Sequence, residues 1–326
     1  MSNAEVLAWL LEAENPSVRC LALTDLLDRP KDDPEYVAAQ ATIPGWGPAK
    51  AILDAQWPEG YWMRPGAGYS PKHKATIWQV IFLEAMGAPR TQDINRACAY
   101  VLGQSRLPDG RFSAYKTAKG ATPCLNGNLL RAMLQLRYVD SRLDESLSAL
   151  IETVNRDGFC CRFNLPGRPA ARMRDGLPCA WGGVKTLGAF AEISRECRGE
   201  AMVTAIEAGL VLLLDGDLEG GDYATATRLS PLWQKFGFPL GYTSDLLEAL
   251  DVAARLGVKR DPRFSTVVET VRSKRDELGR WRLEYAPENT WAVFGRVGQP
   301  NKWVTLRALS TLRRCGEDQD EDCDSV

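Results

Sequence analysis

Six prolines recur along the chain at nearly constant spacing, each just before a stretch with helical character. Successive prolines are 55, 52, 55, 61 and 61 residues apart. Proline suits the first turn of a helix, because the backbone amide that it lacks would have no partner there. A repeat of this length indicates a series of similar helical units. The six positions are Pro16, Pro71, Pro123, Pro178, Pro239 and Pro300.

More polar helical segments lie between the proline-led ones. Apolar residues recur three and four positions apart, as in Ile77, Val80 and Ile81, which is typical of helices. Alternating strand patterns are almost absent, so the chain is predicted to be all-α. The polar segments are expected at 92–105, 142–154, 200–214 and 262–277, with weaker candidates near 3–13 and 46–56.

The proline-led helices are the more apolar set, so we expect them to form an inner ring with the polar set outside. Six such pairs can close on themselves and leave no exposed end. The links from outer to inner helices are long, and long loops in compact domains are often functional. A site is therefore expected at the rim that carries these links and the inner-helix N-termini. The long links are 57–71, 106–122, 158–178, 216–239 and 279–300.

The composition is that of a soluble globular protein, with 45% apolar and 25% charged residues. The formal charge is −2, but residues 316–326 hold six acids and no base. We predict a single domain over 1–315 and an acidic, disordered tail over 316–326. Without the tail, 40 bases face 36 acids, a balance that does not indicate a nucleic-acid-binding surface.

Membrane and export signals are missing from the pattern. No apolar run approaches the roughly 18 residues that a membrane-spanning helix needs, and the first residues enter a helical pattern with no basic-then-apolar leader. The nine cysteines are an odd number, which together with the missing export signal indicates reduced thiols in a cytoplasm.

Gln56 opens the segment QWPEGYW, which has the form Gln-x-x-x-Gly-x-Trp. This segment resembles the turns between helix pairs in squalene and oxidosqualene cyclases. The alternation of inner and outer helices is similar to that of the protein prenyltransferase β-subunit. Later segments, Phe236-GFPLGYTSDLLEAL and Lys302-WVTLRAL, resemble a bacterial squalene-cyclase-like branch of unassigned activity. The resemblance covers nearly the whole chain and implies an α/α toroid with about six inner and six outer helices.

The catalytic motifs of that superfamily do not carry over. The Asp-x-Asp-Asp acid motif of hopene-type cyclases is absent, and its nearest counterpart is Asp215-Gly-Asp217 on a glycine-rich turn. The Asp-Asp-x-x-Asp metal motif of ionisation-type cyclases is absent too. Protein prenyltransferases hold zinc with Asp, Cys and a later His, but the one histidine here, His73, precedes every cysteine except Cys20.

Cysteines and the histidine are expected at one sector of the rim. Cys124 and Cys179 directly follow prolines at the starts of consecutive inner helices, and His73 lies two residues after Pro71. Three interpretations stay open. The residues could hold zinc, could act as thiol acid and base because helix N-termini lower thiol pKa values, or could simply be buried apolar residues. If the site holds zinc, the candidate metal ligands are Cys124, Cys161, Cys179 and His73.

Other candidates follow from the same geometry. Tyr242 and Asp245 are three residues apart, so on one helix they would share a face and could orient a proton donor. Their alternative roles are packing and capping. Tryptophans could line a cavity for a hydrocarbon or a cation, and the basic segment from Arg162 to Arg174 could clamp a phosphate or carboxylate. The candidate substrate-binding residues are Trp78, Trp181, Trp303, Lys302 and Arg162.

The resemblance implies an enzyme with a central cavity for an apolar, terpenoid-like small molecule. We predict isomerisation, dehydration or cyclisation by cysteine acid–base or zinc–thiolate chemistry, since linalool dehydratase-isomerase has a similar helical barrel. The catalytic candidates are Cys124, Cys179, His73, Tyr242 and Asp245. The alternative is a non-catalytic protein that holds a lipid or peptide in the same cavity.

Overall fold

The computed structural model describes residues 3–160, 178–215, 218–219 and 230–316. Predictions for Cys161, Arg162, Asp217 and the tail beyond Gly316 fall outside these ranges. Within them the regular secondary structure is helical, accompanied by isolated β-bridges. The prediction of an all-α chain is confirmed.

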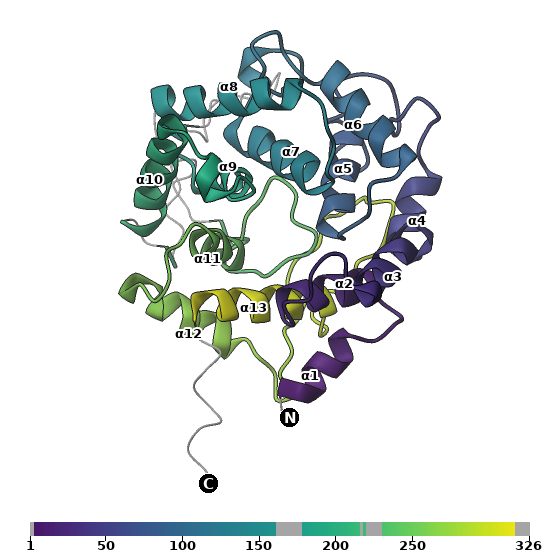
Figure 1. Ribbon diagram of the computed structural model, residues 1–326, viewed down its shortest axis with the longest axis vertical. Helices are drawn as coiled ribbons and strands as arrows, with labels where there is room; N and C mark the ends of the chain where they lie inside the picture. The colour runs from purple at the N-terminus through teal and green to yellow at the C-terminus, as the bar shows by residue number, and fades with distance from the viewer. Residues whose placement is uncertain (1–2, 161–177, 216–217, 220–229, 317–326) are drawn as a thin grey trace.

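Six helices form the inner ring, and the others surround it (Figure 1). Each inner helix packs against the next from α5 round to α13, and α13 packs against α2. The inner set is α2 (Pro16–Asp25), α5 (Thr76–Ala85), α7 (Pro123–Gln135), α9 (Ala180–Phe190), α11 (Leu246–Arg255) and α13 (Lys302–Cys315). This arrangement is the predicted α/α toroid.

The outer helices lie where polar segments were predicted, with one addition. Most pack directly on an inner neighbour, such as α6 on α5, α8 on α7 and α10 on α9. Helix α3 (Pro34–Thr42) was not predicted; it packs on α2. The remaining outer helices are α1 (Asn3–Leu10), α4 (Gly47–Asp54), α6 (Gln92–Gln104), α8 (Arg142–Asp157), α10 (Glu200–Leu214) and α12 (Ser265–Ser273).

The ring closes between the first and last inner helices and between α2 and α5. The Trp303 indole on α13 donates to Ser17 Oγ on α2 at 3.0 Å. The Ser17 hydroxyl in turn donates to the carbonyl of Met86, just past α5, at 2.8 Å. Both side chains are buried, so this relay joins three inner helices where the two ends of the described chain meet.

The prolines begin helices less often than predicted. Pro16 and Pro123 are the first residues of α2 and α7, but α5 begins five residues after Pro71 and α11 seven residues after Pro239. A side chain that caps the helix decides the start of α11, because Asp245 accepts a hydrogen bond from Glu248 N. An N-cap carboxylate satisfies an amide that otherwise has no partner.

Glycine turns connect outer to inner helices as the Gln56 segment suggested. Gly60 has φ +92°, and a Cβ there would lie 2.6 Å from the Arg96 carbonyl oxygen. Two residues later, the Trp62 backbone N–H donates to Thr76 Oγ1 at 3.2 Å and its indole donates to the Ile52 carbonyl at 2.7 Å. Trp62 therefore connects the end of α4 to the start of α5. Trp281 makes the same two bonds, to Thr305 and Val271.

Residues 235–245, here called the central loop, cross the middle of the ring (Figure 1). The Asn128 side chain on α7 donates to the Gly241 carbonyl at 2.9 Å. On the α13 side, Phe238 stacks on Trp303 with centroids 4.6 Å apart. The loop thus fills the ring near the N-terminal ends of its inner helices. Among the described helices, none has the length and apolar character required to cross a bilayer.

Candidate functional site

A cavity of about 430 Å³ lies on the axis of the ring. The inner helices supply most of its lining, largely from their second halves, and Leu240 and Phe238 of the central loop also line it. Tyr36 and Gln40 of α3 lie at its edge. The cavity therefore faces the rim with the short links, whereas the sequence indicated a site at the opposite rim. Its volume falls in the range of small-molecule sites.

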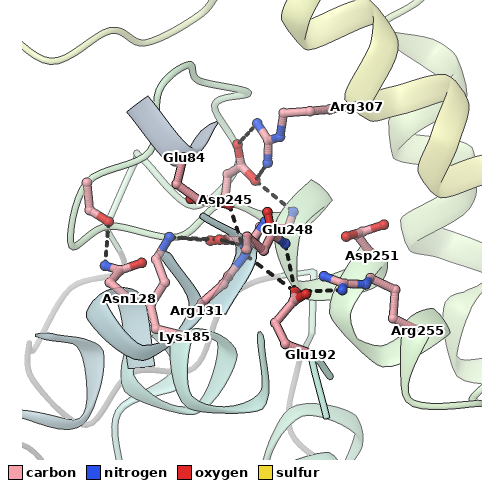
Figure 2. Close-up of polar contacts among 12 residues, drawn as sticks. Glu84, Asn128, Arg131, Lys185, Glu192, Asp245, Glu248, Asp251, Arg255 and Arg307 are labelled. Atoms are coloured by element: carbon pink, nitrogen blue, oxygen red, sulfur yellow. Dashed lines mark hydrogen bonds and ion pairs between the residues drawn. The ribbon is translucent and has the colours of Figure 1, made fainter. Parts of the chain in front are cut away.

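Charged side chains converge on this cavity, as Figure 2 shows. They come from all six inner helices and from the segments that follow α2, α7 and α9. The bases are Lys31, Arg131, Arg137, Lys185, Arg255, Arg307 and Arg314, and the acids are Asp25, Glu84, Glu192, Glu248 and Asp251.

Arg131 is the centre of the network. Three carboxylates surround its guanidinium: Glu248 at 3.3 Å, Glu84 at 3.6 Å and Glu192 at 4.0 Å. Burial alone would lower the pKa of Arg131, but these carboxylates raise it above its ordinary value. Arg131 is therefore a fixed positive charge in the middle of the ring.

Lys185 is the most deeply buried charge of the set, with its side chain 2% exposed. Its ammonium lies 2.8 Å and 2.7 Å from the two carboxylate oxygens of Glu248. Burial lowers the pKa of Lys185, and the contact with Glu248 opposes that shift. A close partner is needed here, because an unpaired ion in such a place costs several kcal/mol.

Glu84 differs from the other carboxylates. Among the described residues, its ion-pair partner is Arg131 at 3.6 Å. Burial raises the pKa of Glu84, with Arg131 opposing and the nearby Glu192 adding to the rise. Glu192 itself pairs with Arg255 at 2.6 Å and accepts from Gln135 at 2.7 Å. Glu84 is thus a carboxyl group of the cavity whose pKa is raised by burial. Such groups cluster at functional sites.

Asp245 belongs to the same network in a supporting role. Its carboxylate receives both terminal nitrogens of Arg307, at 2.8 Å and 3.0 Å, and also caps α11. Tyr242 precedes α11 and is not part of it. The predicted shared helical face of Tyr242 and Asp245 is therefore wrong, because the helix begins only at Leu246.

The N-terminal end of the ring holds a cluster of aromatic side chains. Tyr242 packs edge-on with Trp181 and Trp78, with centroids 5.7 Å and 6.3 Å apart. Lys72 places its ammonium 3.6 Å from the centre of the Tyr242 ring, and burial lowers the pKa of Lys72 to about 8. His73 lies edge-on to Trp78. The structure brings these four predicted residues together with Lys72, which the sequence places beside His73 at the same rim.

The predicted thiols lie at this end too. Cys124 Sγ is 3.3 Å from the Thr122 hydroxyl. In its thiolate form, Cys124 would interact electrostatically with Lys72, Tyr242 and Cys179. Burial raises the pKa of Cys124, and raises that of Cys179 to about 12. These directions are opposite to the expected lowering by helix N-termini, because desolvation of the thiolate outweighs the dipole here.

Two other predicted residues lie away from this cluster. Lys302 pairs with Glu12 at 2.5 Å beside α1, on the outside of the ring. Trp303 lines the axial cavity and stacks on the central loop. Neither residue therefore shares a site with Tyr242 and Cys124.

The predicted zinc ligands do not form a metal-binding group within the described ranges. No three His, Cys, Asp or Glu side chains there are arranged to hold an ion. His73 uses Nδ1 in a 3.0 Å contact with the Glu288 carbonyl, and burial lowers its pKa. Because Cys161 lies outside those ranges, the four-residue set stays a prediction.

Sequence reasoning missed the charged cavity although a signal was present. Inner helices otherwise dominated by apolar residues carry isolated charges: Glu84 in α5, Arg131 in α7 and Lys185 in α9. A charge in an apolar inner helix must face either a partner or a cavity. The same test applied to α11 and α13 finds Glu248 and Arg307.

Comparison with known proteins adds little to this description. No family model matches the chain, and no curated protein does. A solved protein from Actinoplanes is 14% identical, with 96% of this chain and 97% of that chain covered and a TM-score of 0.45. A type II terpene cyclase from Scytonema, in complex with its product merosterolic acid A, is 12% identical, with 96% and 99% covered and a TM-score of 0.36. At these scores the fold assignment rests on the packing of the helices themselves.

Proposed function

We propose that this protein is an enzyme that binds a polar small molecule in the axial cavity, with Glu84 exchanging a proton with that molecule. The convergence of charged side chains from all six inner helices on one cavity supports the proposal. If these positions served stability alone, apolar residues would be expected there, because replacing buried ion pairs by well-packed apolar side chains is often neutral or stabilising.

The environment of Glu84 suits general acid–base work. A carboxyl group whose pKa is raised towards neutrality gains efficiency as a proton donor and acceptor. Burial supplies the rise, and Arg131 limits it. Burial lowers the pKa of Lys185, so burial acts against the charged form of both groups.

Incubation of the purified protein with a mixture of polar metabolites tests this proposal. Untargeted mass spectrometry should find one compound lost and one gained with the wild type, and neither change with Glu84→Gln, which keeps the shape of the side chain but cannot exchange the proton. Glu145→Gln on the exposed face of α8 is the control and should behave as the wild type. Identical changes with and without the Glu84 carboxyl would contradict the role of Glu84.

A second candidate function uses the aromatic cluster at the other end of the ring. The gathering of Trp78, Trp181, Tyr242 and Cys124 favours it. In this proposal an apolar, terpenoid-like compound is isomerised, dehydrated or cyclised there, with cysteine as acid or base. Native mass spectrometry should then detect a co-purifying hydrocarbon, and the double variant C124A/C179A should lose turnover while remaining folded. Unchanged turnover in that variant rules out the thiols.

A further inference from the structure

We infer that the ligand of the axial cavity is an organic anion, whose carboxylate or phosphate oxygens accept hydrogen bonds from Arg131 and Ser310. This inference rests on the proposal that the cavity is a small-molecule site, and it names the chemical class of the molecule. It comes from two unpartnered groups that can donate hydrogen bonds and from an excess of bases in the lining.

Two buried donors in the cavity have no acceptor among the described residues. Ser310 on α13 is 2% exposed, and its hydroxyl has no hydrogen-bond partner. Arg131 Nε is also buried without one, since its nearest carboxylate, Glu84, lies 3.6 Å away. Buried polar groups are nearly always hydrogen-bonded in native proteins. Two unmet donors in one cavity therefore indicate a ligand that supplies acceptors.

The carboxylates of the lining are already engaged, so they do not call for a cationic ligand. Glu248 pairs with Lys185, Glu192 with Arg255, and Glu84 with Arg131. Asp25 and Asp251 share Arg314. Each acidic group thus has a base within the protein. Glu248 Oε2 has no hydrogen-bond partner of its own, but it lies 2.7 Å from the Lys185 ammonium.

Charge at the mouth has the same sign. Lys31 and Arg137 line the cavity, are exposed, and form no ion pair with another described residue. The lining carries seven bases and five acids, and the bases remain in excess when Asp245, the partner of Arg307, is added to the acids. The lining therefore has a net excess of positive charge, which favours the entry of an anion.

Matched pairs of compounds test the sign of the ligand. Isothermal titration calorimetry would compare succinate with succinamide, and glucose 6-phosphate with glucose, so that each pair differs mainly in charge. We expect the anionic member of at least one pair to bind and its neutral partner to bind at least tenfold more weakly. Which pair responds distinguishes a carboxylate from a phosphate.

Ser310→Ala tests the predicted contact without disturbing the fold, because the hydroxyl has no protein partner to lose. The affinity for the responding anion should fall about tenfold, as for one hydrogen bond to a charged group. Ser273→Ala on the outer helix α12 is the matched control and should leave the affinity unchanged. Among the described residues, the Ser273 hydroxyl donates to the Thr270 carbonyl of its own helix.

Arg137→Gln tests the charge at the mouth. It should weaken binding severalfold at low salt and much less at high salt, because a partly exposed charge is screened. Lys119→Gln, an exposed lysine ahead of α7, serves as the control.

Three outcomes overturn the inference: equal binding of charged and neutral partners, no binding of either anion up to millimolar concentrations, or an unchanged affinity in Ser310→Ala. The first leaves the proposed function standing, since a neutral polar ligand would still occupy the cavity. The proposed function fails separately if Glu84→Gln leaves every metabolite conversion unaltered.

Discussion

The two ends of the ring are built from the same six helices but filled with different chemistry. At the N-terminal end, Trp78 and Trp181 pack against Tyr242 of the central loop, and Lys72 lies over the Tyr242 ring. At the C-terminal end, charged side chains surround an open cavity. Aromatic rings pack together at one end, whereas paired charges line a cavity at the other. The repeat fixes the frame, and the residues placed along each inner helix give the two ends their different chemistry.

The largest effect should come from removing one partner of the buried pair in the charged end. Glu248→Ala leaves the Lys185 ammonium without its carboxylate in a site that is 2% exposed. We expect a loss of about 3–5 kcal/mol in the free energy of unfolding, measured by urea denaturation.

The double variant K185M/E248L sharpens this test, because it removes both charges together. It should recover most of the lost stability. Breaking the exposed Lys50–Asp54 pair with Asp54→Ala is the control, and should cost at most about 1 kcal/mol. If the double variant is no more stable than Glu248→Ala, the loss comes from packing and not from an unpaired charge.

A smaller effect is expected in the aromatic end. Trp78→Phe removes part of a buried ring and the 2.7 Å hydrogen bond from its indole to the Tyr69 carbonyl. The free energy of unfolding should fall by about 1–3 kcal/mol. Because no ionised group is lost, the decrease should be the same at low and high salt. A strong salt dependence would mean that Lys72 and its neighbours contribute charge effects here as well.

Glu84→Gln should change the pH dependence of stability more than its magnitude. The folded-state pKa of Glu84 is raised, so the native state holds its proton to higher pH than the unfolded state does. Stability from this group is present in acid and is lost as pH rises through the folded pKa. The variant should therefore gain stability relative to the wild type as pH increases, in thermal melts from pH 4 to pH 8. A constant difference across that range would contradict the raised pKa.

The smallest perturbation probes Lys72 without a mutation. With a pKa of about 8, its amine is neutral in a sizeable fraction at pH 8, and neutral amines are the nucleophilic form. Competitive acetylation followed by peptide mass spectrometry should label Lys72 faster than the exposed Lys119. Equal labelling would show that the aromatic end does not perturb this amine.

Helical periodicity and loop lengths were sufficient to predict the ring, because both are encoded locally. Patterns such as Ile77, Val80 and Ile81 mark an inner face whatever the tertiary context. The starts of α5 and α11 were misplaced. At α11, residues 240–244 belong to the central loop and Asp245 caps the helix. That choice depends on contacts with Asn128 and Trp303, which lie far away in sequence.

The site was harder to predict than the fold for a related reason. The aromatic and thiol residues were identified by their positions after prolines, and the structure does gather most of them. Whether a thiol is activated depends on burial, which raised the pKa of Cys179 where the helix dipole alone would lower it. Whether a charged cavity forms depends on which face of its helix each isolated charged residue occupies. Arg131 and Glu248 meet across α7 and α11, and only the assembled ring reveals that contact.

The seam formed by Trp303, Ser17 and Met86 has a consequence for synthesis of the chain. Within this seam, Ser17 and Trp303 are 286 positions apart in sequence. During synthesis, α2 therefore lacks its neighbour α13 until that helix has been made. Such distant pairings slow folding, so this step should limit the rate at which the cavity becomes enclosed.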